Sequence, residues 1–332
     1  MITTQEQNRQ QQVAQPLAST SKPKGVPSHD VLNQLIQWFN QGKQAEALTL
    51  ATELTQDFPK HGIAWKVLGV LYQQTMHSEA AEQALKNAAE LLPKDPEAQY
   101  NYANCLYDLR KLQAAQSYYL KALKFAPQFV QALFNLADVQ KELKQWASAE
   151  ANYRKGFKLA PQHVHMYFHF GVVLQEQGKY KEAIKQYEKA LEVDANNASI
   201  HLNLGAAYKA LNEPTLAETY YCTAIRCNPS HVGAYNNLGI VLKALGRNDE
   251  AEQAYLQAIH LDDNYLPAYK NLGMLYKDTG QVKAAENCYL KALSLEPATA
   301  ETLNNMGVVM MNQGRYAEAE ENVRQALVLA PK

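Results

Sequence analysis

An alanine recurs every thirty-four residues along this chain, nine times, with no insertion or deletion between occurrences. The alanines are Ala47, Ala81, Ala115, Ala149, Ala183, Ala217, Ala251, Ala285 and Ala319. A second marker keeps the same step and is usually proline, at Pro59, Pro93, Pro127, Pro161, Pro229, Pro297 and Pro331, with Ala195 and Asp263 in the remaining two places. A strict period of this length predicts a stack of similar units, each packed on its neighbours, and not one globular core.

Charge and hydropathy exclude several classes of function. Lys and Arg total 32 and Asp and Glu total 33, so the net charge is −1 and the chain lacks the basic surface of a nucleic-acid binder. No apolar run approaches the roughly 20 residues of a membrane helix. Residues 1–27 have no apolar central stretch, so we expect no secretory signal and a disordered Gln/Ser/Pro-rich leader. The four cysteines follow no disulfide or zinc spacing, which favours free thiols in a cytoplasmic protein.

Two helical runs of apolar residues fill each unit, which predicts an all-α fold. The units start at residues 28, 62, 96, 130, 164, 198, 232, 266 and 300, and residues 28–332 form the repeat domain. A glycine separates the two runs at Gly42, Gly178, Gly246, Gly280 and Gly314, and Asn212 takes this place in the sixth unit. Both residue types tolerate the left-handed conformation, so this residue is predicted to end the first helix.

A small residue stands at the eighth place of most units, on the first helix. Gly69, Gly171, Gly205, Gly239, Gly273 and Gly307 hold this place, with alanine in two other units. We expect the periodic alanine of the second helix to face this small residue. Tyrosines lie four residues after the alanine in units three to eight, at Tyr119, Tyr153, Tyr187, Tyr221, Tyr255 and Tyr289. Their predicted role is core packing, in the gap to the next unit.

These markers resemble the tetratricopeptide repeat. The second unit carries Trp65-x-x-Leu68-Gly69-x-x-Tyr72, followed by Ala81, Leu85, Ala88 and Pro93. The resemblance covers residues 28–331 and implies a right-handed superhelix, or solenoid, of nine helix-turn-helix units whose first helices line the concave face. The first unit has Leu35 in place of glycine and is interpreted as the N-terminal cap.

A ladder of asparagines marks the sixth place of the units, on the face expected to line the groove. Its members are Asn33, Asn101, Asn135, Asn203, Asn237, Asn271 and Asn305, while Val67 and His169 interrupt it. An amide carries two donor hydrogens and an acceptor, so evenly spaced amides can pair with an extended peptide backbone. The alternative is that asparagine is simply the consensus residue of tetratricopeptide units at this place.

A second ladder stands at the twelfth place, with Lys141, Gln175, Lys209, Lys243 and Lys277 in units four to eight. The run Asn237-Leu238-Gly239-Ile240-Val241-Leu242-Lys243 resembles the superhelical region of O-linked N-acetylglucosamine transferases. That resemblance implies that Asn101, Asn135, Asn203, Asn237, Asn271 and Asn305 hold substrate polypeptide. For the lysines, a solvated helix end favoured by the helix dipole is the alternative interpretation.

The fifth place changes character along the chain. Tyr100, Phe134 and Phe168 occupy it in units three to five, whereas Asn236, Lys270 and Asn304 occupy it in units seven to nine. This pattern predicts an apolar anchor site beside a polar stretch that grips a peptide backbone. Packing of the three rings against neighbouring helices is the other interpretation.

The chain carries no motif of an enzyme. It has no phosphate-binding glycine loop and no nucleophile elbow, and we predict no catalytic residue, no cofactor and no metal site. The last helix, around residues 318–329, presents Val323, Ala326, Leu327 and Leu329 without a following helix. From this we expect a longer protein or a partner at that end, including self-association through this helix.

Two functions of different class remain open. The first is a peptide-binding scaffold that recruits substrates for a larger glycosyltransferase, whose catalytic domain would lie beyond Lys332. The second is a freestanding adaptor that assembles a protein complex. A sulfotransferase-like domain in place of the glycosyltransferase is a variant of the first.

Overall fold

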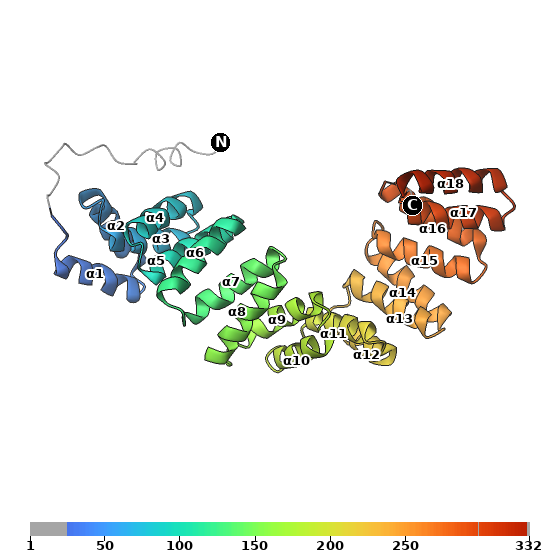
Figure 1. The fold of residues 1–332 in the computed structure, drawn as a ribbon, viewed down its shortest axis with the longest axis horizontal. Coiled ribbons are helices and arrows are strands. Elements are labelled where there is room, and N and C mark those ends of the chain that lie inside the picture. The colour runs from blue at the N-terminus through green and yellow to red at the C-terminus, as the bar shows by residue number, and fades with distance from the viewer. Residues whose placement is uncertain (1–24, 298, 331–332) are drawn as a thin grey trace, which may run out of the picture. The chain divides into compact units, whose positions relative to one another are not determined.

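The computed structural model describes residues 25–297 and 299–330, and these residues form eighteen α-helices and no strand (Figure 1). The first helices of the units are α1 (His29–Asn40), α3 (Gly62–Gln74), α5 (Pro96–Asp108), α7 (Val130–Glu142), α9 (His165–Glu176), α11 (Ala198–Ala210), α13 (Val232–Ala244), α15 (Leu266–Asp278) and α17 (Ala300–Asn312). The second helices are α2 (Gln44–Asp57), α4 (Ser78–Leu91), α6 (Leu112–Phe125), α8 (Trp146–Leu159), α10 (Tyr180–Leu191), α12 (Pro214–Cys227), α14 (Asn248–Leu261), α16 (Val282–Leu295) and α18 (Tyr316–Leu329). The predicted all-α repeat fold is confirmed.

The helices divide into two compact bodies, Met1–Val139 and Gln140–Lys332, called here the N-terminal and the C-terminal body. In both bodies the first helix of a unit begins at or one residue after the start that the alanine period sets. Most of the predicted leader, residues 1–24, lies outside the described residues.

Within each body, successive first helices touch one another. The contacts are α1 to α3 and α3 to α5 in the N-terminal body, and α9 to α11, α13, α15 and α17 in turn in the C-terminal body. No such contact joins successive second helices among the described α10 to α18. Helices that lie closer together line the inner side of a stack, so in each body the first helices form the inner face, as predicted.

The turn between the two helices of a unit needs one left-handed residue. Gly42, Gly178, Gly246, Gly280 and Gly314 have φ between 71° and 76°, and Asn212 has φ 59°, which confirms the predicted helix ends. Met76, Arg110 and Lys144 hold the same conformation, at φ 61°, 58° and 57°. The period alone places this turn in units two to four, because no glycine or asparagine marks it there.

Four of the six eighth-place glycines pack against the tyrosine of their own unit, whereas Gly69 faces Leu85 and Gly307 faces Val323. A Cβ atom built on Gly171, Gly205 or Gly239 would lie 2.4, 2.6 or 2.5 Å from a ring carbon of Tyr187, Tyr221 or Tyr255 respectively. The alanine was expected to face this glycine, but the nearest side chain is the tyrosine ring. The expected packing toward the next unit also occurs, since the rings of Tyr153 and Phe170 have centroids 5.4 Å apart. The tyrosine ring fills the space between the two helices of one unit, and at Gly171, Gly205 and Gly239 it leaves no room for a Cβ atom. All six tyrosines are buried, as predicted.

A hydrogen bond reaches the second marker of the period in four units. The side chain at the fourth place of a unit donates to the backbone oxygen six residues earlier, at the end of the preceding unit. The pairs are Trp65 with Pro59 (2.9 Å), Tyr167 with Pro161 (2.8 Å), His201 with Ala195 (2.9 Å) and Tyr269 with Asp263 (3.2 Å). The marker therefore lies where each unit is joined to the next.

Ion pairs join every second pair of units on the second helices. A glutamate at place 21 pairs with a cation at place 16 of the following unit in Glu82–Lys111, Glu150–Lys179, Glu218–Arg247 and Glu286–Arg315. The intervening junctions carry other residues at these places, such as Ile184 and Glu213. These ion pairs therefore recur every sixty-eight residues, which is two units, and they occur in both bodies.

The last helix exposes part of its apolar surface. Leu327, Val328 and Leu329 are 56%, 75% and 54% exposed, whereas Ala326, which was predicted to be uncovered with them, is 7% exposed and buried. Across the part of the chain that is described, every helix is too short or too polar to cross a membrane.

Candidate functional site

The asparagine ladder lies half-buried on the inner faces of the two bodies. Asn101, Asn135, Asn203, Asn237, Asn271 and Asn305 all have intermediate exposure on first helices. Val67, which interrupts the ladder, is 7% exposed and belongs to the core. The sequence therefore placed these amides on the correct helices and at an accessible depth.

Half of the ladder is already engaged in hydrogen bonds between neighbouring units. Asn135 donates to the Tyr100 hydroxyl (3.1 Å) and to Asn104 Oδ1 (3.0 Å). Asn271 donates to Asn236 Oδ1 (2.8 Å), and Asn305 Oδ1 accepts from Lys277 (2.9 Å). Three side chains make no hydrogen bond to another described residue, those of Asn101, Asn203 and Asn237. Their amide donors and acceptors are all available to a ligand. Each engaged amide still has a free donor or acceptor position.

The lysines of the second ladder differ in their surroundings. Lys141 donates to Nδ1 of His169 (3.2 Å), a ladder position of the next unit, as Lys277 does to Asn305. Lys243 pairs with Asp278 (2.7 Å). Lys209 is exposed and pairs with no described residue. Three of the four lysines therefore link neighbouring units, and Lys209 has its ammonium group free for a ligand.

The three aromatic side chains at the fifth place do not form one open surface. Phe134 is 2% exposed, so its ring lies inside the stack and not on an open surface. Tyr100 packs against Phe129, with ring centroids 4.7 Å apart, and Phe168 packs beside Tyr187 at 6.1 Å. Packing, the second interpretation of these rings, accounts for Phe134 completely and for the half-buried Tyr100 and Phe168 in part.

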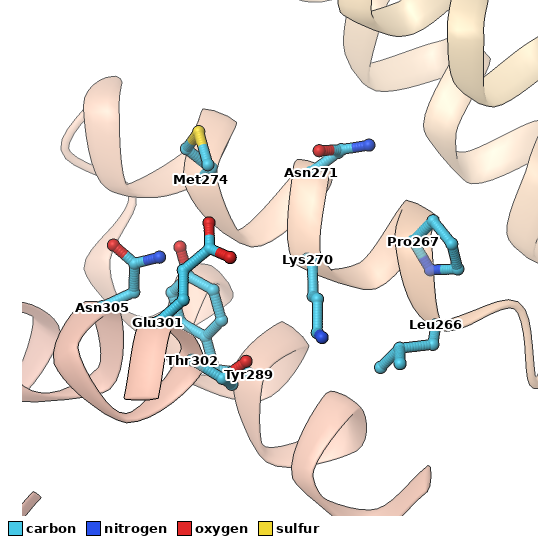
Figure 2. A pocket seen from close by; sticks show the side chains of 9 residues that line it. All are labelled: Leu266, Pro267, Lys270, Asn271, Met274, Tyr289, Glu301, Thr302 and Asn305. Atoms are coloured by element: carbon cyan, nitrogen blue, oxygen red, sulfur yellow. The ribbon is translucent and has the colours of Figure 1, made fainter. Parts of the chain in front are cut away.

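Two cavities open on the inner faces, one in each body. In the N-terminal body a cavity of about 510 Å³ is lined by Val70, Gln73, Gln74, Asn104, Tyr107, Asp108, Asn135 and Asp138. In the C-terminal body a cavity of about 220 Å³ lies between α15 and α17 (Figure 2). It is lined by Leu266, Pro267, Lys270, Asn271, Met274, Tyr289, Glu301, Thr302 and Asn305. Both cavities contain ladder asparagines.

Sequence reasoning missed the ninth place, which separates these two cavities chemically. In the first cavity it is Val70, Asn104 and Asp138, of which two are polar, and in the second it is Met274. The signal was present as a row of apolar residues, Val172, Ala206, Ile240, Met274 and Val308, in units five to nine. One turn beyond the ladder, this row gives the inner face of the C-terminal body an apolar strip beside its amides.

The histidines and cysteines show no arrangement for chemistry. No group of three or more His, Cys, Asp or Glu with metal-binding geometry occurs among the described residues. The four cysteines are unpaired. Burial raises the pKa of Cys105 and of Cys288 to about 11, so both thiols stay protonated near neutral pH and are poor nucleophiles.

Family models of the tetratricopeptide repeat match six segments of the chain. They cover residues 77–129, 118–151, 171–212, 198–231, 230–295 and 300–332. The matches together cover more than half of the chain, so the chain is a tetratricopeptide-repeat protein and a scaffold for protein interaction. No curated protein matches the chain.

Solved structures with this fold are similar to the chain. A tetratricopeptide repeat protein from Parabacteroides merdae has 18% identity and a TM-score of 0.59, over 71% of this chain and 93% of its own. The Pseudomonas aeruginosa pilF protein has 22% identity and a TM-score of 0.52, over 63% and 95%. MamA has 27% identity and a TM-score of 0.46, over 50% and 90%. At these identities the first two support the fold alone.

Proposed function

We propose that the inner face of the C-terminal body binds an extended segment of polypeptide. The observation that carries this proposal is the row of amides with unused hydrogen-bonding capacity on α11, α13 and α15, repeated every thirty-four residues. Asn203 and Asn237 use none of their capacity within the described protein, and Asn271 uses one donor. A polypeptide backbone is the ligand that offers donors and acceptors at every residue, whatever its sequence.

The apolar row at the ninth place supports the same ligand. Ala206, Ile240 and Met274 lie one turn beyond Asn203, Asn237 and Asn271. A peptide held through its backbone by the amides places alternate side chains against this strip. Burial of apolar side chains contributes affinity that amides alone do not supply, since hydrogen bonds to water are lost on binding.

The experiment is binding of the full chain to an array of random 12-residue peptides. The test variant carries Asn203→Ala, Asn237→Ala and Asn271→Ala together. The matched control carries three substitutions of exposed amides on second helices, Gln253→Ala, Asn287→Ala and Gln325→Ala. We expect the test variant to lose most binding and the control to keep it. Equal binding by the two variants would remove the ladder from the function.

The wider context of this binding is also a proposal. The Asn-Leu-Gly-x-x-x-Lys pattern supports a substrate-recruiting region of a larger glycosyltransferase in the cytoplasm. A freestanding adaptor is the second candidate. Reading the gene beyond Lys332 for a nucleotide-sugar or sulfotransferase-like domain distinguishes them, and recovery of one tight partner in place of many extended substrates favours the adaptor.

Self-association through α18 is a separate proposal, supported by the exposed Leu327, Val328 and Leu329. Sedimentation of the full chain against Leu327→Glu tests it. A concentration-dependent dimer that the substitution abolishes is the expected result, and a monomer at all concentrations for the unsubstituted chain contradicts it.

A further inference from the structure

The buried tyrosines of the repeat differ in what their hydroxyl groups contact. In the third unit the Tyr119 hydroxyl donates to Asn104 Oδ1 (2.6 Å), which stands at the ninth place. In the fifth unit the Tyr187 hydroxyl donates to Gln175 Oε1 (3.2 Å), at the twelfth place. The hydroxyl therefore points from the core toward the inner face, where a polar side chain of the same unit accepts its hydrogen.

Units six and eight provide no such acceptor. Their ninth places are Ala206 and Met274, and their twelfth places are Lys209 and Lys277, which carry only donor hydrogens. The hydroxyl oxygens of Tyr221 and Tyr289 are accordingly buried and have no hydrogen-bond partner among the described residues. A buried hydroxyl without a partner is unfavourable and rare in folded proteins, which makes each of these groups a candidate contact for a ligand.

Tyr289 lines the cavity between α15 and α17, and its ring is 1% exposed. Figure 2 shows its hydroxyl group directed upward from α16 into the space beside Glu301 and Asn305. Lys277 holds the Asn305 oxygen, so the amide nitrogen of Asn305 is left facing Glu301. Besides Lys270 and Asn271, the cavity thus offers two donors, from Tyr289 and Asn305, and one strong acceptor, the Glu301 carboxylate.

The charge of the cavity is balanced. Its lining contains one cation, Lys270, and one anion, Glu301. Lys270 is in addition paired with Glu296, at 3.3 Å. A neutral ligand group is therefore favoured over a carboxylate, which would meet Glu301, and over an ammonium group, which would leave the Tyr289 hydroxyl without an acceptor.

We propose that this cavity binds the carboxamide side chain of a glutamine or asparagine in the bound polypeptide. The carboxamide oxygen accepts from the Tyr289 hydroxyl and the Asn305 amide, and its NH₂ group donates to Glu301. The methylene groups of the side chain pack against Leu266 and Met274. This inference rests on the proposed peptide binding and adds the residue type that the eighth and ninth units select. Sites with buried polar groups discriminate strongly against analogues that lack the matching group.

The test uses small probes that do not need the rest of the groove. N-acetyl-glutamine methylamide, the corresponding glutamate and the corresponding norleucine are titrated into the full chain, and the side-chain amide signals of Asn305 and Asn271 are followed by NMR. The key variant is Tyr289→Phe, which keeps the ring that packs on Gly273. Its matched control is Tyr187→Phe, because that hydroxyl already has a protein acceptor.

We expect saturable shifts of the Asn305 signal with the glutamine probe, binding at least about five-fold weaker for the other two probes, and a similar loss in Tyr289→Phe but not in Tyr187→Phe. Equal shifts for all three probes, no shift with glutamine, or unchanged binding in Tyr289→Phe overturns the inference. Failure here with peptide-array binding intact leaves the ladder function standing. Glutamine binding without any peptide binding removes the ladder function and keeps the cavity.

Discussion

The inner face of the third and fourth units and that of the eighth and ninth units have the same backbone plan but opposite hydrogen-bonding states. In the former, Asn104 accepts from both Tyr119 and Asn135, and Tyr100 accepts from Asn135 as well. In the latter, Met274 replaces this acceptor and the Tyr289 hydroxyl has no partner among the described residues. In these two regions the residue at the ninth place therefore decides whether the tyrosine hydroxyl has a partner within the protein or is available to a ligand.

The first prediction concerns the inner face of the third and fourth units, where a substitution of Asn104 removes the hydrogen-bond acceptor. Asn104→Ala leaves the Tyr119 hydroxyl and one Asn135 donor unpaired, and we expect it to lower the local free energy of unfolding by about 2 kcal/mol. Hydrogen exchange of the α5 and α6 amides measures this. Asn237→Ala is the matched control, since Asn237 has no described partner, and should cost less than about 0.5 kcal/mol. Similar losses of local stability in the two variants would contradict the hydrogen-bond network around Asn104.

The second prediction compares two hydroxyl deletions that leave the rings in place. Tyr187→Phe loses a hydrogen bond and should lower the stability of α9 and α10 by about 1 kcal/mol, whereas Tyr289→Phe removes an unpaired hydroxyl and should raise that of α15 and α16 by about as much. Local stability is again measured by hydrogen exchange. Effects of the same sign would show that the Tyr289 hydroxyl is satisfied in solution.

The third prediction concerns a substitution that gives the eighth unit a hydrogen-bond acceptor at the ninth place, as the third unit has. Met274→Asn supplies an acceptor at the ninth place, so we expect it to pair with the Tyr289 hydroxyl and stabilise α15 by less than about 1 kcal/mol, because asparagine is a poorer helix former than methionine. Binding of N-acetyl-glutamine methylamide should fall in parallel. Met274→Leu is the control that changes shape without adding an acceptor. Unchanged probe binding in Met274→Asn would show that the residue at the ninth place does not control binding in the cavity.

The fourth prediction concerns the outer ion pairs, in which the two bodies do not differ. Burial alone would raise the pKa of Glu150, but hydrogen bonds from Lys179, Arg154 and Gln177 lower it overall. A depressed carboxyl pKa contributes stability above the unfolded value of about 4.5, and that contribution is lost as the pH falls through the folded pKa. The local opening free energy at the α8–α9 junction, obtained from hydrogen exchange after correction for the intrinsic exchange rate, should therefore fall below about pH 4.5, by up to about 1 kcal/mol.

The junction between α10 and α11 is the internal control for this pH effect, because it has Ile184 and Glu213 where the other junction has its ion pair. Its exchange should change less over the same range. Glu150→Gln should abolish the difference between the junctions. If the two junctions of the unsubstituted chain lost local stability identically as the pH fell, the ion pairs that recur every sixty-eight residues would have no energetic consequence.

The repeat register allowed most of the fold to be predicted. Helix starts, the left-handed turns and the burial of the tyrosines follow from one period, because each unit repeats the same local physics. The packing partner of each tyrosine did not follow, since a period gives the position of a residue and not the residue that it faces. Gly171 with Tyr187 is such a case, with the contact inside one unit.

The site was predicted less completely than the fold. The period placed the asparagine ladder on the inner face but could not show that Asn135 and Asn271 are partly engaged by neighbouring units. It also suggested Phe134 as an anchor, although that side chain is buried. Hydrogen bonds between units depend on side-chain reach across a junction, which no single-unit pattern contains.

Photo-crosslinking tests the central claim, that the inner face of the C-terminal body holds polypeptide, most directly. A benzophenone side chain is introduced in place of Ile240, on the inner apolar row, or of Leu256, which is 39% exposed on α14. Each protein is irradiated with the best-binding peptide of the array. Crosslinking at position 240 and not at position 256 is the predicted result. Crosslinking at position 256 alone, or equally at both, would contradict the claim.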